Sequence, residues 1–138
     1  EELLAIPDSV LAVQAAHQVF NGNIACASGA DMEKVLMQLQ KVALAPYFKH
    51  ILSGHDCKRN KPFPDVYLKA ASALETDISS CIVIEDSITG VTSGASAGAE
   101  VWAYCPENAH FSEEQLQLAG AKLCFNSMKD LSRLFIEH

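Results

Sequence analysis

Residues 81–86 read Cys-Ile-Val-Ile-Glu-Asp, a run of four apolar residues that ends in two carboxylates. A short apolar run of this kind predicts a buried strand over Cys81–Ile84. The small residues that follow predict a helix over 88–98, and Val101–Tyr104 predicts another strand. A strand, a helix and a second strand in this order are typical of a parallel sheet with a crossover helix.

The same alternation continues on both sides of this unit. Upstream, the pattern first predicts a helix that is capped by Asp8 or Ser9 and has apolar residues at helical spacing, namely Val10, Val13, Ala16 and Val19. It then predicts a strand Ile24–Ala27, a helix from Asp31 and a turn at 45–48. A strand His50–Ser53 and a helix from Pro64 to about Glu75 follow. Downstream, it predicts a helix at 112–119, an extended piece Lys122–Phe125 and a last helix from Asn126 or Ser127. The sequence therefore predicts an α/β fold, a Rossmann-like parallel sheet with helices on both faces.

Composition and charge restrict the class of protein. The 138 residues are 49% hydrophobic and 20% charged, which fits one globular domain, and a net charge of −7 disfavours binding to nucleic acid or to an anionic membrane. The five cysteines are odd in number and widely spaced, which favours reduced thiols in the cytoplasm. The opening Glu-Glu-Leu-Leu-Ala-Ile-Pro lacks a basic segment and a long apolar run, which argues against a signal peptide or a membrane span. It also lacks an initiator Met, so we expect a piece of a longer protein.

Polar residues follow several of the predicted strands. Ser28 comes directly after Ile24–Ala27, Ser53-Gly54 closes the next strand, and Glu85-Asp86 closes a third. Ligands of parallel sheets bind at the carboxyl ends of the strands, so these residues are expected to meet there. Ser28 could hold a phosphate with its hydroxyl while the backbone N–H groups of Gly29 and Ala30 point at the anion. The alternative interpretation of Ser28 is a helix cap.

Lys61 and the two acids complete the predicted site. Lys61 lies in Lys-Pro-Phe-Pro-Asp, where the following proline restricts its backbone and an ammonium would neutralise a phosphoryl group and a nearby carboxylate. Glu85 and Asp86 would repel each other at a buried strand end unless a cation lies near them, and their oxygens suit Mg²⁺. A solvated lysine and a pair of helix-capping acids are the alternatives.

The order of these motifs resembles a known family. Ala-Ser28-Gly, Lys61-Pro-Phe-Pro-Asp-Val-Tyr and Val-Ile-Glu85-Asp86-Ser-x-x-Gly-Val resemble motifs two, three and four of the haloacid dehalogenase superfamily, over residues 6 to 106. The Glu-Asp-Ser form looks most like the beta-phosphoglucomutase and sugar-phosphate phosphatase branch. The resemblance implies that Ser28, Gly29 and Lys61 bind the substrate phosphate, with Ser28 and Lys61 in catalytic roles, and that Asp86 and Glu85 hold Mg²⁺, Asp86 being the firmer ligand.

The departure from the family lies at the front of the chain. The first motif, Asp-x-Asp-Gly-Thr, which supplies the nucleophile on the central strand, occurs nowhere in the sequence, and neither does the helical cap. Residues 1–138 are therefore expected to be a partial core domain that lacks the first strand. The missing strand would leave a gap between the strands Ile24–Ala27 and Cys81–Ile84. These two strands could pair directly, or a strand from a second copy or from an N-terminal fragment could fill the gap. We favour a strand supplied from outside the chain.

The function implied by the resemblance is that of a magnesium-dependent phosphatase. The parent protein would hydrolyse a small phosphate monoester, a sugar phosphate, through an aspartyl-phosphate, and this chain alone would be inactive. Two alternative functions of the longer protein remain open: a phosphosugar mutase, and a noncatalytic interaction or regulatory module built on the same core. A receiver-type signalling domain is disfavoured because its acids precede the hydroxyl and the lysine, whereas here the acids come last.

Overall fold

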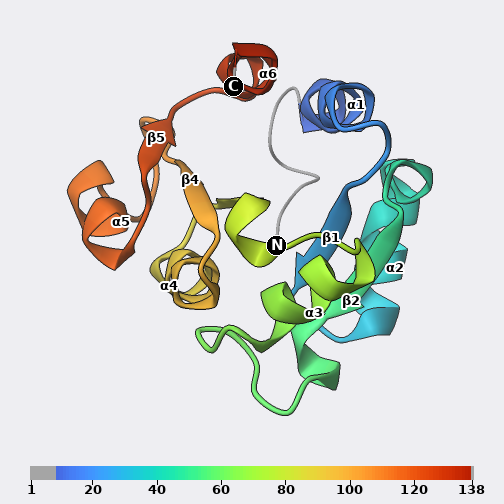
Figure 1. Ribbon diagram of the computed structural model, residues 1–138. Helices are drawn as coiled ribbons and strands as arrows, with labels where there is room; N and C mark the ends of the chain where they lie inside the picture. The colour runs from blue at the N-terminus through green and yellow to red at the C-terminus, as the bar shows by residue number, and fades with distance from the viewer. Residues whose placement is uncertain (1–8, 138) are drawn as a thin grey trace.

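The structure, a computed structural model, describes residues 9–137 (Figure 1). The helices are α1 (Ser9–Val19), α2 (Met32–Lys41), α3 (Asp65–Ala73), α4 (Ile88–Ala97), α5 (Glu113–Ala119) and α6 (Met128–Glu137), with short 3-10 turns η2 (Ala45–Tyr47), η3 (Gly54–Asp56) and η4 (Ile78–Ser80). The strands are β1 (Ala25–Ser28), β2 (His50–Ser53), β3 (Ile82–Glu85), β4 (Glu100–Tyr104) and β5 (Leu123–Phe125). The predicted α/β fold is confirmed, although the helix cap expected at Asp8 lies outside the described residues.

Two strand boundaries differ from the prediction in a way that matters for the site. The strand predicted at Ile24–Ala27 is Ala25–Ser28, and the strand predicted at Cys81–Ile84 is Ile82–Glu85. In both cases the terminal polar residue pairs in the parallel ladder, Ser28 with Ser53 and Glu85 with Ala103. Apolar composition did not reveal this, because a polar residue can pair in a ladder when its side chain finds polar partners. Ser28 and Glu85 are therefore held by strand backbone rather than by loops.

The sheet consists of two separate parts. β1 pairs with β2, and β3, β4 and β5 pair in that order, all in parallel. Figure 1 shows the two parts facing each other across the molecule. A cavity of about 440 Å³ lies between them, lined by β1 and β3 and by helices α1, α3 and α6. Direct pairing of β1 with β3, one of the two expected outcomes, is not found in the part of the chain that the structure describes.

Helices cover both faces of the strands, as predicted. Val101 and Trp102 are neighbours in β4, and successive side chains of a strand point to opposite faces. Val101 packs in a cluster with residues of α3, α4 and α5, whereas Trp102 packs with residues of α1 and α6. A third cluster, around Val35 and Leu39, fixes α2. None of the helices within residues 9–137 is long and apolar enough to cross a membrane.

The glycines in and directly after α4 have different roles. A Cβ on Gly94 would lie 2.9 Å from Val101 Cγ2 and 3.0 Å from Val83 Cγ1, so this glycine permits the close approach of helix and sheet. Gly98 instead ends the helix with a left-handed φ of 100°. Gly90 lies against the carboxylate of Glu85, which places it in the site.

Candidate functional site

Ser28 ends β1 at the edge of the cavity and is buried, with 3% of its surface exposed. Its Oγ accepts a hydrogen bond from the N–H of Ala30 at 3.1 Å, so the loop toward α2 folds back over the hydroxyl. The helix cap of α2 is Asp31, whose side chain accepts from Lys34 N. The alternative that Ser28 caps this helix is therefore not needed, and its hydroxyl hydrogen can still be donated to an anion.

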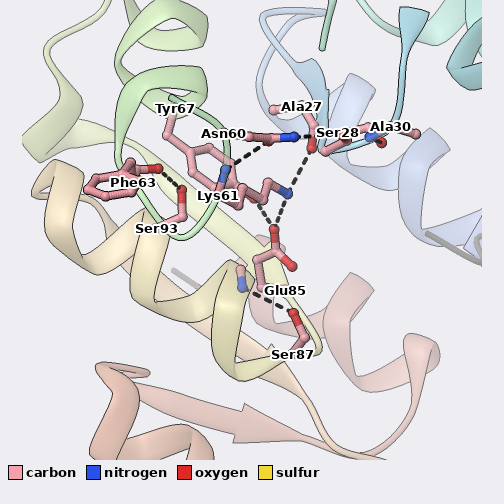
Figure 2. Close-up of polar contacts among 12 residues, drawn as sticks. Ala27, Ser28, Ala30, Asn60, Lys61, Phe63, Tyr67, Glu85, Ser87 and Ser93 are labelled. Atoms are coloured by element: carbon pink, nitrogen blue, oxygen red, sulfur yellow. Dashed lines mark hydrogen bonds and ion pairs between the residues drawn. The ribbon is translucent and has the colours of Figure 1, made fainter. Parts of the chain in front are cut away.

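The side chain of Lys61 is buried, with 8% of its surface exposed. Its Nζ lies 2.5 Å from Glu85 Oε2 and 3.2 Å from the carbonyl oxygen of Ala27, as Figure 2 shows, and 5.0 Å from the ring centroid of Tyr67. The peptide bond between Lys61 and Pro62 is cis. The alternative of a solvated lysine is wrong, because the ammonium lies between the ends of β1 and β3.

Glu85 provides the negative partner of this lysine. It ends β3 with 7% of its surface exposed, and its Oε2 accepts hydrogen bonds from Lys61 Nζ and from the hydroxyl of Tyr67. Room for the carboxylate exists only because residue 90 is glycine, since a Cβ there would lie 2.0 Å from Glu85 Oε1. The cation that the two adjacent acids were expected to need is thus supplied, at Glu85, by Lys61.

Asp86 follows β3 and differs from Glu85 in its surroundings. It is exposed and lines the cavity, while Ser87 caps α4 by accepting from Gly90 N at 3.0 Å. The alternative of two capping acids is therefore wrong for α4. The carboxylate of Asp86 offers hard oxygen donors of the kind that Mg²⁺ prefers. Within residues 9–137 no group of three His, Cys, Asp or Glu side chains lies together, so further ligands would have to be water, substrate or groups from beyond that range.

Several residues of the site were not identified from the sequence. Tyr67 donates to Glu85, and Ser93 of α4 donates to the carbonyl of Phe63 at 2.6 Å, which ties the Lys61 loop to the helix. Asn60 bonds to the backbone on both sides of the site. Tyr67 falls within the quoted Lys-Pro-Phe-Pro-Asp-Val-Tyr stretch, so its position was a usable signal, whereas Asn60 and Ser93 carry no pattern that marks them.

The described residues bring Ser28, Gly29, Lys61 and Glu85 together at the carboxyl ends of β1 and β3. Figure 2 shows Lys61 between the Ala27-Ser28 segment and Glu85, with Asn60 alongside. A hydroxyl, backbone N–H groups, an ammonium and carboxylates at one edge of the cavity suit an anion together with a cation. The cavity is otherwise lined mainly by apolar side chains, from the two strands and from helices α1, α3 and α6.

Comparison with known proteins agrees with this arrangement. The family model described as "Haloacid dehalogenase-like hydrolase" matches residues 6–104. An uncharacterized protein of Haemophilus influenzae is 42% identical over 79 residues, which are 57% of this chain and 40% of that protein. The 6-phosphogluconate phosphatase of Escherichia coli is 33% identical over 81 residues, 58% of this chain and 37% of that protein. The chain thus covers only about two fifths of the length of these relatives.

A solved structure extends the likeness to the whole fold. The crystal structure of a HAD family hydrolase from Deinococcus radiodurans, with bound phosphate and sodium, superposes with a TM-score of 0.84 at 26% identity. The superposition covers 96% of this chain and 59% of that one. Because the family match spans most of the sequence and includes Ser28, Lys61 and Glu85, this chain belongs to the haloacid dehalogenase-like hydrolases.

Proposed function

We propose that the chain is the C-terminal core portion of a magnesium-dependent phosphatase that acts on a small phosphate monoester, a sugar phosphate. The observation that carries the proposal is the position of the Lys61 ammonium between the strand ends that bear Ser28 and Glu85. Membership of the hydrolase family and the name of the Escherichia coli relative, a 6-phosphogluconate phosphatase, support the class of substrate.

The role of Lys61 follows from its bonding. An ammonium group has three N–H donors, and within residues 9–137 two of them bond to Glu85 Oε2 and Ala27 O. The third is available for a phosphoryl oxygen. Glu85 balances the charge of the lysine while the site is empty, so the ammonium can stay in place without a ligand. It is then already oriented when phosphate arrives, which is the arrangement that stabilises charge in phosphoryl transfer.

Ser28 and the loop after it would hold the phosphate from the other side. The Ser28 hydroxyl can donate to one oxygen and the N–H of Gly29 to another. Mg²⁺, bound by Asp86, would neutralise phosphoryl charge. Asp86 is the better candidate for this role, because the Oε2 of Glu85 already accepts from Lys61 and Tyr67; a metal role for Glu85 stays a prediction.

The attacking group is not encoded in residues 1–138, since no Asp-x-Asp occurs there. In the proposed reaction a carboxylate from outside this chain attacks phosphorus in line, and the bond from phosphorus to the ester oxygen breaks to release the sugar alcohol. Water then attacks the aspartyl-phosphate, which releases inorganic phosphate and restores the carboxylate. The same absence favours the second candidate function, a noncatalytic module that binds a phosphorylated metabolite. A phosphosugar mutase would use the same residues. The cytoplasmic location stays a prediction.

The test compares the chain with the full-length protein from which it comes. We expect the purified 138-residue chain to release no phosphate from p-nitrophenyl phosphate or from a panel of sugar phosphates, and the full-length protein to hydrolyse at least one with Mg²⁺. Full-length Lys61→Ala should then lower kcat at least tenfold, a loss of about 1.4 kcal/mol of transition-state stabilisation. A full-length protein without any turnover would favour the noncatalytic module, and turnover by the chain alone would contradict the proposed source of the nucleophile.

A partner that supplies a strand is the companion proposal. Within residues 9–137, β1 pairs only with β2 and β3 pairs only with β4, and residues of β1 and β3 line the cavity between them. Open strand edges beside an apolar cavity are a template for another strand. We propose that this strand comes from a second copy or from an N-terminal fragment. Light scattering with mass spectrometry should detect the association, and a stable monomer without a companion peptide would contradict it.

A further inference from the structure

Asn60 joins the two loops that form the phosphate side of the site. Its Nδ2 donates to the carbonyl oxygen of Gly29 at 2.9 Å, and its Oδ1 accepts from the N–H of Lys61 at 2.7 Å (Figure 2). One amide side chain therefore fixes both the segment after β1 and the backbone of the residue that carries the ammonium. A side chain with one donor and one acceptor end, such as Asn, is needed to satisfy both partners.

The space for this side chain is provided by Gly54, at the end of β2. Gly54 is buried, and a Cβ built on it would lie 2.0 Å from Asn60 Oδ1 and 3.0 Å from Asn60 Cγ. The neighbouring Ser53 donates its hydroxyl to the carbonyl of Ala30. The loops after β1 and β2 and the loop before α3 thus meet at Asn60.

The bond to Gly29 O has a consequence for the direction of an N–H group. A trans peptide is planar, with its C=O and N–H pointing in opposite directions. Since Asn60 holds the Gly29 carbonyl, the N–H of Ala30 in the same peptide is turned away from Asn60, and it donates to Ser28 Oγ. If this peptide rotated, its carbonyl oxygen would face the Ser28 hydroxyl and repel an anion bound there.

We propose that Asn60 is a positioning residue for phosphate binding: it orients the Gly29–Ala30 peptide and the Lys61 backbone so that Ser28 and Lys61 converge on one anion. The inference rests on the proposed phosphate site. Asn60 itself bonds to backbone groups of its own chain, so its effect on the ligand is exerted through Ser28 and Lys61.

The first experiment titrates the full-length protein with inorganic phosphate and follows the backbone amides by NMR. We expect the amide signals of Gly29 and Ala30 to shift on binding, and Asn60→Ala to raise the dissociation constant at least tenfold. The matched control is Asn126→Ala, because Asn126 is an exposed asparagine after β5, two strands away from β3. Thermal unfolding of each variant separates lost binding from lost folding.

The second experiment is a double-mutant cycle with Gly54. Gly54→Ala should weaken phosphate binding in the presence of Asn60, because the new methyl group displaces that side chain. In the Asn60→Ala background the same change should have less than a twofold effect, since the group it displaces is gone. If Asn60→Ala does not fold, Gly54→Ala alone still tests the inference, because it displaces the Asn60 side chain without removing it; unchanged phosphate affinity in this variant would contradict the positioning role.

The outcomes separate this inference from the proposed function. Full-length wild-type protein that binds no phosphate would overturn the proposed site, and the role of Asn60 with it. Wild-type binding with the Gly29 and Ala30 amide shifts, together with unchanged affinity in Asn60→Ala, would overturn the positioning role alone. Equal effects of Gly54→Ala in both backgrounds would also overturn it.

Discussion

Gly90→Ala is the substitution that tests most directly whether the buried ion pair forms the site. The new Cβ would lie 2.0 Å from Oε1, 2.1 Å from Cδ and 2.6 Å from Oε2 of Glu85, so the carboxylate must move. Glu85 then loses the geometry of its bonds to Lys61 and Tyr67, all of which lie in a site with little exposure to water.

Two opposing effects determine the size of the change. Replacing glycine by alanine inside a helix stabilises that helix by about 1 kcal/mol. Disrupting a buried ion pair so that a charge is left without its partner costs about 3–5 kcal/mol. The second effect is larger, so we expect the free energy of unfolding to fall by about 2–4 kcal/mol. Phosphate affinity should fall as well, because Lys61 loses the carboxylate that holds it between the strands.

Gly94→Ala is the matched control for this prediction. It lies one helical turn further along α4, and its Cβ would meet Val101 and Val83 rather than a charged group. We expect it to lower stability while phosphate affinity, measured by calorimetry on folded protein, stays within twofold of wild type. A Gly90→Ala protein that unfolds at higher urea than wild type and binds phosphate equally would refute the account of the ion pair, since only the helix propensity would then be acting.

Three further predictions concern single side chains. Tyr67→Phe removes a hydrogen bond to buried Glu85, so the free energy of unfolding should fall by about 1–3 kcal/mol in urea titrations; an unchanged midpoint would contradict this. Full-length Asp86→Asn should need more Mg²⁺ for half-maximal activity at an unchanged melting temperature, because Asp86 is exposed, and an identical Mg²⁺ titration would remove it from the metal site. Burial, and to a smaller extent the charge of Glu113, raises the pKa of the Cys105 thiol in the folded protein. The thiol of the unfolded chain therefore loses its proton at a lower pH, so the free energy of unfolding should decrease as the pH rises above about 9. The same pH series on Cys105→Ala should show a smaller decrease, and an equal decrease would contradict this.

The fold could be predicted because its elements have strong periodic signals. Val35 and Leu39 occur at helical spacing and are buried at 2% exposure, and the apolar runs around Val83 and Val101 became β3 and β4. The errors fell at strand ends, where Ser28 and Glu85 interrupt the apolar pattern. Their place in the ladder is decided by tertiary partners, which a one-dimensional pattern does not contain.

The site was predictable as a set of residues but not as a set of bonds. The positions of Ser28, Lys61 and Glu85 after predicted strands were enough to expect that they meet. The sequence did not indicate that Glu85 would accept from Lys61 and Tyr67, since this depends on the missing side chain at Gly90. The contribution of a glycine here is the space beside it, which depends on the tertiary neighbours and not on the local sequence.

The bonding of Lys61 also explains how the two parts of the sheet stay in register at the site. No backbone ladder joins β1 to β3 within the described residues, yet Lys61 Nζ bonds to Ala27 O in one strand and to Glu85 in the other. The ammonium therefore bridges the gap at its carboxyl end, where the phosphate would bind. Removing it would at once lose a phosphate ligand and loosen the spacing of the strands that position Ser28. A Lys61 variant alone cannot separate the lost contact to phosphate from the loosened spacing of the strands, because it changes both. The Gly90→Ala variant can separate them, because it moves the Glu85 carboxylate while the Lys61 ammonium and its bond to Ala27 O remain.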